Sequence, residues 1–202
     1  MNTGNIKSYA PKARNDFIAA MTKQATKYGI TEKTIEPLNV KGDLAIINGK
    51  PFPLAVAKPR ETLVQKIKLV GFEQVIEQLA YSWFNRLCAI RYMELADYLG
   101  HGRRVLSYPQ QQGGLQILEE CLEIDLPGLD QHKARELKLD GTKDEELYRM
   151  LLLAQCHALH KAMPFLFEDI DDETELLLPD NLTKTDSLIR DLVSSIPEND
   201  WA

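Results

Sequence analysis

Apolar residues recur at intervals of three and four along much of the chain, the spacing of one buried face on an amphipathic helix. The stretch around Phe17 predicts a helix that starts at Tyr9 and ends at Gly29, since proline follows in its first turn and glycine commonly ends a helix. A Thr-x-x-Glu capping-box pattern, Thr142 to Glu145, marks the start of a later helix. The same spacing predicts helices over residues 59–70, 72–99, 115–124, 142–163 and 184–195.

One short segment has the pattern of a β-hairpin. Asn48-Gly49 lies between two apolar runs, and both residues tolerate the positive φ angles of a tight hairpin turn. Pro51 and Pro53 cannot donate hydrogen bonds to a neighbouring strand, so their strand is expected at a sheet edge. The predicted fold is therefore mainly α, a helical bundle with one small β-hairpin at about residues 44–54.

The chain is expected to form one main domain. We assign residues 1–180 to an N-terminal helical domain and residues 181–202 to a terminal helix and the start of a linker. The segment after Pro197 resembles the opening of another helix. A large aromatic residue, Trp201, so close to the chain end suggests a fragment of a longer protein.

The helix expected over residues 72–99 is apolar around most of its circumference, yet it carries two arginines. An unpaired buried charge costs several kcal/mol, so both Arg86 and Arg91 need partners. Arg91 can pair with Glu94, three residues further along the helix, whereas the partner of Arg86 must come from another segment. The three residues are predicted to form a structural clamp. The alternative is a guanidinium presented to a phosphate.

Charge is distributed unevenly along the 202 residues, whose net charge is −6. Residues 1–70 contain twelve Lys or Arg and five Asp or Glu, a net charge of +7, while residues 71–202 carry −13. This asymmetry indicates either a nucleic-acid-facing end or simply two differently solvated faces. No apolar run approaches the ~18 residues of a transmembrane helix. The N-terminus also lacks a secretory signal, so a cytoplasmic location without membrane contact is expected.

Six basic residues are candidates for contact with DNA, because basic loops bind phosphates without reading sequence. Arg103 and Arg104 are adjacent in a glycine-containing turn, where they could grip a phosphate. A solvated surface remains the alternative for each candidate. The full set is Lys12, Arg14, Lys58, Arg60, Arg103 and Arg104.

No metal site is predicted. Cys156, His157 and His160 share a helical neighbourhood, but a closed zinc site needs four ligands and no second pair has suitable spacing. The acidic segment at residues 168–175 lacks the spacing of a known calcium loop, so we expect a solvated loop or a docking site for a basic surface. The three cysteines are expected to be reduced core thiols: Cys88, Cys121 and Cys156.

Four phrases, in order, resemble one protein family over nearly the whole chain. They are NIKSYAPKARNDF at residues 5–17, AYSWFNRLCAIRYME at 80–94 with YLGHGRRVLS at 98–107, CHALHKAMPFLFE at 156–168, and LTKTDSLIRDL at 182–192. Together they resemble the N-terminal region of the PglX family, the large adenine-specific DNA methyltransferases of BREX phage-defence systems.

The resemblance implies which parts are missing here. Members of the family are several times longer, and their catalytic core binds S-adenosylmethionine and flips adenine into a pocket formed by a D/N/S-P-P-Y/F/W motif. Neither that motif nor a Phe-x-Gly-x-Gly cofactor loop occurs in this sequence. We therefore expect no catalytic, cofactor-binding or metal-binding residues in this chain, and no enzyme activity from it alone.

The leading hypothesis is an accessory domain that packs on the catalytic domain of the same polypeptide and weakly holds double-stranded DNA without sequence preference. One alternative is a protein-interaction module that docks other BREX proteins or is bound by a DNA-mimicking phage inhibitor. A purely structural domain is the third possibility.

Overall fold

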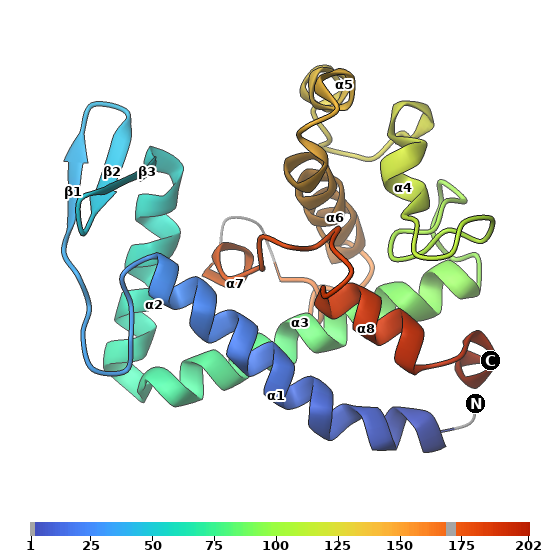
Figure 1. The fold of residues 1–202 in the computed structure, drawn as a ribbon, viewed down its shortest axis with the longest axis horizontal. Helices are drawn as coiled ribbons and strands as arrows, with labels where there is room; N and C mark the ends of the chain where they lie inside the picture. The colour runs from blue at the N-terminus through green and yellow to red at the C-terminus, as the bar shows by residue number, and fades with distance from the viewer. Residues whose placement is uncertain (1–2, 169–172) are drawn as a thin grey trace. The chain divides into compact units, whose positions relative to one another are not determined.

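The computed structural model describes residues 3–168 and 173–202, which form two compact units. The first unit comprises residues 1–13, 84–169 and 180–202, and the second comprises residues 14–83 and 170–179. The long helices α1 (Gly4–Lys27) and α3 (Phe72–Leu95) contribute residues to both units (Figure 1). Helices dominate the described residues and the strands form a single small sheet, so the predicted mainly α fold is confirmed.

The sheet belongs to the second unit. It consists of β1 (Leu38–Lys41), β2 (Leu44–Ile47) and β3 (Lys50–Pro53) in antiparallel order β1-β2-β3. The predicted hairpin is the β2–β3 pair, and its turn has the positive φ angles expected of Asn48 (49°) and Gly49 (73°). The proline-containing strand β3 lies at an edge, as predicted, whereas β1 was not predicted.

One face of the sheet is buried against the end of α1. Ala45 and Ile47 of β2 are 0% and 1% exposed, and the ring of Phe52 lies 5.3 Å from that of Tyr28. A Cβ at Gly29 would collide with the side chain of Ile47, so glycine is required where the chain leaves α1. The alternate residues of each strand point to the opposite face of the sheet, because successive side chains along a strand lie on opposite faces.

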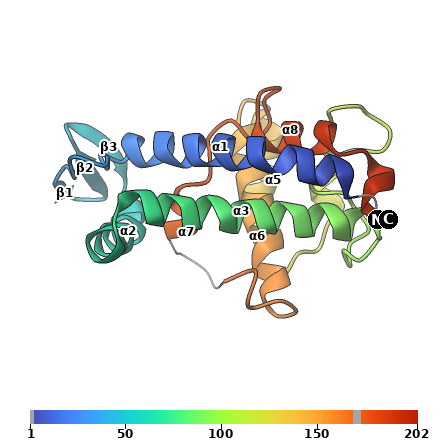
Figure 2. The same ribbon diagram turned by 90° about the horizontal axis from the view of Figure 1, so that it is seen from below.

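Helix α2 (Ala57–Val70) follows a 3-10 turn, η1 (Leu54–Val56), and packs against the short helix α7 (Glu173–Leu176). Two side chains tie the segment around α7 to the long helices. The indole N–H of Trp83 donates to the Thr174 carbonyl at 2.6 Å, and the amide of Gln24 donates to the Leu178 carbonyl at 3.0 Å. In this unit the second half of α1 lies beside the first half of α3 (Figure 2).

The first unit is built around α6 (Asp144–His160), which packs against α4 (Gln116–Glu119) and α5 (Gln131–Asp140). Tyr148 on α6 is fully buried, and its hydroxyl donates to the Val105 carbonyl at 3.0 Å. The other elements of this unit are η2 (Cys121–Glu123), α8 (Leu188–Ser195) and η3 (Glu198–Trp201).

Both ends of the chain belong to the first unit. The side-chain amide of Asn5, on α1, donates to the carboxylate of Asp200, in η3, at 2.6 Å. Lys12 forms an ion pair with Asp191 on α8, also at 2.6 Å. The first turns of α1 are thereby fastened to the C-terminal segment.

Several predicted helix ends were wrong. Helix α1 begins at Gly4 rather than Tyr9 and continues through Pro11, which lies two turns after the start and cannot donate the hydrogen bond expected at an interior helical position. Helix α3 ends at Leu95 rather than Leu99, since Asp97 adopts a left-handed conformation (φ 56°).

Three further helical predictions differ from the structure. The short 115–124 helix is split into α4 and η2. The predicted capping box is absent: the N-cap of α6 is Lys143 rather than Thr142, the hydroxyl of Thr142 donates to Asp140, and Glu145 accepts from the backbone N–H of Thr183 at 2.8 Å. Helices α5 and α7 were not predicted. In the described part of the chain no helix is long and apolar enough to cross a membrane.

Candidate nucleic-acid interface

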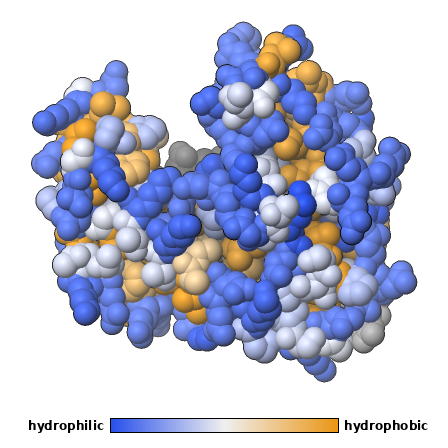
Figure 3. Space-filling model, in the orientation of Figure 1, coloured by the Kyte–Doolittle hydropathy of each residue, from blue (hydrophilic) through white to orange (hydrophobic). Residues whose placement is uncertain are grey.

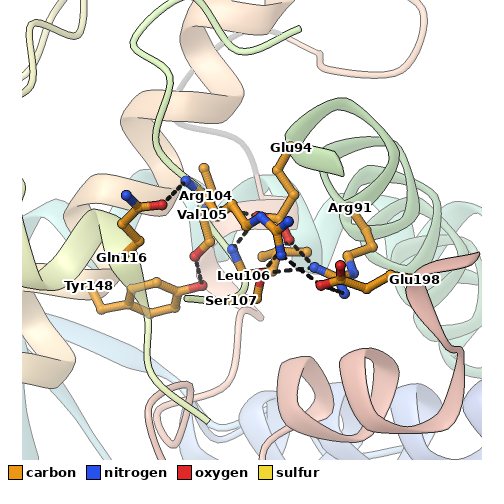
Figure 4. Close-up of polar contacts among 9 residues, drawn as sticks. All are labelled: Arg91, Glu94, Arg104, Val105, Leu106, Ser107, Gln116, Tyr148 and Glu198. Carbon is orange, nitrogen blue, oxygen red and sulfur yellow. Dashed lines mark hydrogen bonds and ion pairs between the residues drawn. The ribbon is translucent and has the colours of Figure 1, made fainter. Parts of the chain in front are cut away.

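A buried ion pair lies within the first unit, near the C-terminal end of α3. The side chains of Arg91 and Glu94 are 2% and 0% exposed, with Nη1 and Oε1 2.5 Å apart. Glu94 also accepts from the backbone N–H groups of Val105 (2.7 Å) and Leu106 (2.8 Å) and from the hydroxyl of Ser107 (3.0 Å) (Figure 4). These donors compensate for the desolvation of the carboxylate and fix residues 105–107 against α3.

Glu198 joins a second arginine to this network. Its Oε1 lies 3.2 Å from Nη2 of Arg91 and 2.6 Å from Nη1 of Arg104, so one carboxylate oxygen bridges two guanidinium groups (Figure 4). Partial burial raises the pKa of Glu198, but the hydrogen bonds and charges of Arg104 and Arg91 outweigh it and hold this pKa below its ordinary value.

Arg86 is buried as well, at 2% exposure. Its Nε donates to the backbone carbonyl of Leu166 at 3.2 Å. A partner from another segment was expected for this arginine, and Leu166 lies eighty residues away in the chain.

The turn that carries Arg103 and Arg104 is occupied by ion pairs. Arg103 pairs with Glu120 at 2.9 Å and with Glu123 at 2.8 Å, while Arg104 pairs with Glu198. The hydrogen bond to Glu120, supported by Glu123, raises the pKa of Arg103, and the same bond lowers the pKa of Glu120. A phosphate must therefore compete with carboxylates for either guanidinium.

The remaining DNA-contact candidates differ in their surroundings. Arg14 pairs with Glu77 at 2.5 Å, and Lys12 with Asp191. Arg60 is 3% exposed, donates to the carbonyls of Tyr28 (2.7 Å) and Glu36 (2.5 Å), and has its pKa lowered by desolvation. Its guanidinium holds the chain between α1 and the sheet, and its burial leaves it inaccessible for DNA contact in this structure.

Lys58, in contrast, is exposed and forms no ion pair with any described residue. It shares this property with other lysines of the second unit. These lysines lie in α1, the following loop, the sheet and α2. From the sequence, this region was distinguished only by its excess of positive charge. The set is Lys23, Lys33, Lys41, Lys50, Lys58 and Lys68; we call it the lysine set.

His160, at the end of α6, and His101, in the turn after α3, contribute to the fold. His160 Nδ1 lies 2.6 Å from the Phe167 carbonyl, and His101 Nε2 lies 2.6 Å from Oε1 of Gln155. Within residues 3–168 and 173–202, no three His, Cys, Asp or Glu side chains gather as metal ligands would. Of the predicted acidic loop, residues 169–172 lie outside the described residues, and Glu173 forms an ion pair with Lys66.

The cysteines are free thiols. Burial raises the pKa of Cys88 to about 12, and it also raises that of Cys121. Protonated thiols are poor nucleophiles and poor metal ligands at neutral pH. The arrangement therefore offers charge and hydrogen-bond donors for an anionic ligand, while the thiols of Cys88 and Cys121 are not activated as nucleophiles.

Two relatives match the whole chain. An adenine-specific methyltransferase BrxX from Escherichia coli O9:H4 (strain HS) is 50% identical over 214 residues, and an adenine-specific methyltransferase PglX from Lacticaseibacillus casei (strain Zhang) is 33% identical over 225 residues. The chain spans only 17% and 18% of their lengths, and no protein-family model matches it. The resemblance found in the sequence is thus confirmed: over its whole length the chain is similar to these two adenine-specific methyltransferases, and the match fits an N-terminal domain of such a protein.

Proposed function

We propose that this chain is an accessory domain of an S-adenosylmethionine-dependent adenine-specific DNA methyltransferase in a BREX phage-defence system. In this proposal it packs on the catalytic domain of the same polypeptide and holds double-stranded DNA by its phosphates. The names of the two relatives support DNA as the substrate of the whole protein. The observation that carries the DNA-holding role is the lysine set, six exposed ammonium groups that no described carboxylate neutralises.

Lysines of this kind suit phosphate contact better than the arginine turn does. An exposed, unpaired ammonium gains a phosphate and releases counterions without first breaking an ion pair. Lys41 and Lys50 extend from β1 and β3, and Lys58 and Lys68 from α2. Such contacts give affinity without sequence preference, typically with Kd values of ~10⁻⁴–10⁻⁶ M near physiological salt.

The cofactor is assigned to the parent protein's catalytic domain. S-adenosylmethionine sites of this kind need a glycine-containing loop after a strand. Here the three strands are antiparallel, and the glycine turns at Gly42 and Gly49 lead directly into the next strand. These residues therefore do not fit the cofactor.

The test is a titration of the chain with a fluorescent duplex at low and moderate salt. Replacing Lys41 and Lys50 by Glu should weaken binding at least tenfold, whatever the duplex sequence. The matched control replaces Lys143 and Lys184 of the first unit, which are also exposed, by Glu. Equal loss in both variants would mean that net charge alone matters, and no loss in the sheet variant would exclude the sheet from DNA contact.

A protein-interaction module is the second candidate, and one observation favours it. Val40, Leu44 and Leu54, in and beside the sheet, are 57%, 45% and 41% exposed. The surface over the sheet is accordingly a mixture of hydrophilic and hydrophobic residues in Figure 3. If DNA binding is absent while Leu44→Ser abolishes pull-down of a purified BREX protein, this second function replaces the first.

A further inference from the structure

A cavity of about 350 Å³ opens beside the Glu198 bridge in the first unit. Tyr92, Arg104, Glu198 and Trp201 are among the residues that line it. We propose that this cavity is a binding site for a phosphate group, and that the carboxylate of Glu198 occupies the phosphate position in the unliganded protein. The inference rests on the proposed function, because DNA is one source of such a phosphate.

The geometry of the bridge is that of an anion site. A single carboxylate oxygen contacts Nη2 of Arg91 and Nη1 of Arg104, at 3.2 and 2.6 Å. Two guanidinium groups converging on one oxygen form an arrangement suited to phosphate, whose several oxygens accept forked hydrogen bonds from arginine. A phosphate could keep both contacts and place its remaining oxygens in the cavity.

Charge balance explains why the site needs an anion. Glu94 neutralises Arg91 through the fully buried pair, and Glu198 neutralises Arg104. Moving Glu198 away would leave two arginines facing one remaining carboxylate, a local net charge of +1 at the edge of a partly desolvated cavity. An incoming phosphate restores neutrality at least as well as the carboxylate does.

The two carboxylates differ in how easily they can be displaced. Glu94 has a side chain that is 0% exposed and accepts four hydrogen bonds, so it cannot leave without breaking the fold. The side chain of Glu198 is 52% exposed and lies in the short 3-10 turn η3, where a rotamer change can carry it into solvent. Glu198 is therefore the removable anion.

Among the described residues, two buried donors without partners belong to Trp201, which lines the cavity, and to Arg91, which contacts Glu198. They are the indole N–H of Trp201 and the Nε of Arg91. Buried donors are rarely left unsatisfied. The exposed part of the Tyr92 ring offers an apolar wall beside the phosphate position.

Calorimetric titration with inorganic phosphate tests the site. Glu198→Gln keeps the shape and a hydrogen-bond acceptor but removes the competing charge, so phosphate should bind about tenfold more tightly than to the wild type. Glu198→Gln combined with Arg104→Gln should lose the binding. The matched control is Glu123→Gln, which removes a carboxylate from Arg103 outside the cavity and should leave phosphate affinity unchanged.

Unchanged or weaker phosphate binding by Glu198→Gln would overturn the proposal, as would equal strengthening in Glu123→Gln. If Glu198→Gln fails to fold, Arg104→Gln in the wild-type background provides the test. Its side chain is 22% exposed, and phosphate binding by wild type should disappear in this variant, whereas retention would overturn the proposal.

A parallel titration with duplex DNA separates the two sources of phosphate. If Glu198→Gln also strengthens duplex binding, and Arg104→Gln reverses this, the ligand is a DNA backbone phosphate. If only inorganic phosphate responds, the site takes a small phosphorylated molecule. Failure of the DNA-holding proposal is recognised independently, because it appears as an absence of effect in the Lys41 and Lys50 variant.

Discussion

Arg91 and Glu94 face each other across one turn of α3, with 2.5 Å between Nη1 and Oε1, and neither side chain is more than 2% exposed. This pairing explains how the mostly apolar helix α3 can contain two buried charged side chains. The pair does more than neutralise itself, since Glu94 also accepts the backbone N–H groups of Val105 and Leu106. It is therefore the point at which α3 and the following segment are joined.

Replacing Glu94 by Ala should destabilise the protein by about 3–5 kcal/mol, because it leaves Arg91 buried and uncompensated and removes the acceptor of two backbone donors. Urea denaturation measures the change. Glu77→Ala is the control: it breaks an exposed ion pair with Arg14 and should cost less than about 1 kcal/mol. Similar losses in the two variants would contradict the role of the buried pair.

Arg86→Ala should lower the free energy of unfolding by about 1–3 kcal/mol, since it removes a buried side chain and leaves the Leu166 carbonyl without this donor. Thermal and chemical melting provide the measurement. A variant that melts at the wild-type temperature would show that the guanidinium is free for a ligand rather than required by the fold.

Salt dependence should distinguish the lysines from the arginine turn. Replacing Lys41 and Lys50 together by Ala should reduce the slope of log Kobs against log salt by about 2, close to one per lost phosphate contact. Arg103→Ala should change that slope by less, because Arg103 is already neutralised by Glu120 and Glu123. A larger change of the slope with Arg103→Ala would instead indicate that the turn containing Arg103 contacts DNA.

The Cys88 thiol gives a prediction of pH dependence. Its pKa is about 12 in the folded protein, because burial disfavours the thiolate, against an ordinary value near 9. The unfolded chain therefore loses this proton first as pH rises, and stability should fall between about pH 9 and 12. Unfolding measurements on Cys88→Ala should show a shallower decline, and slow reaction with a thiol reagent at pH 8 is expected for the native protein.

The chain alone should neither bind S-adenosylmethionine nor methylate DNA, because it lacks the cofactor loop and the D/N/S-P-P-Y/F/W motif. Calorimetry with the cofactor and a methyl-transfer assay on an adenine-containing duplex are the measurements. Micromolar cofactor binding would contradict the proposal that catalysis resides in other parts of a longer protein.

The sequence was most informative where local chemistry decides the structure. Asn48-Gly49 predicted its turn because few other dipeptides tolerate two positive φ angles, and proline placed β3 at an edge. The strand β1 was missed because Leu38–Lys41 is short and mostly exposed, although the Gly42-Asp43 turn that follows it, with a φ of 58° at Gly42, was a signal for it. Its strand conformation comes from pairing with β2, which is a tertiary effect.

The candidate site was predicted less well, because burial and pairing depend on distant segments. Nothing near Arg60 in the sequence shows that its guanidinium reaches the carbonyls of Tyr28 and Glu36. Arg104 and Glu198 are 94 residues apart, so the bridge to Arg91 is visible only in the structure. Arg91 and Glu94 could be paired from spacing alone, because the helix itself sets their distance.

The two edges of the sheet differ in a way that limits how strands can add to it. Pro51 and Pro53 deprive β3 of N–H donors, while β1 keeps its donors and exposes Asn39, Val40 and Lys41. A foreign strand can therefore extend the sheet past β1 but not past β3. Copies of this sheet cannot join edge to edge in an unending row, so the prolines protect an exposed, partly apolar ribbon against fibrillar growth.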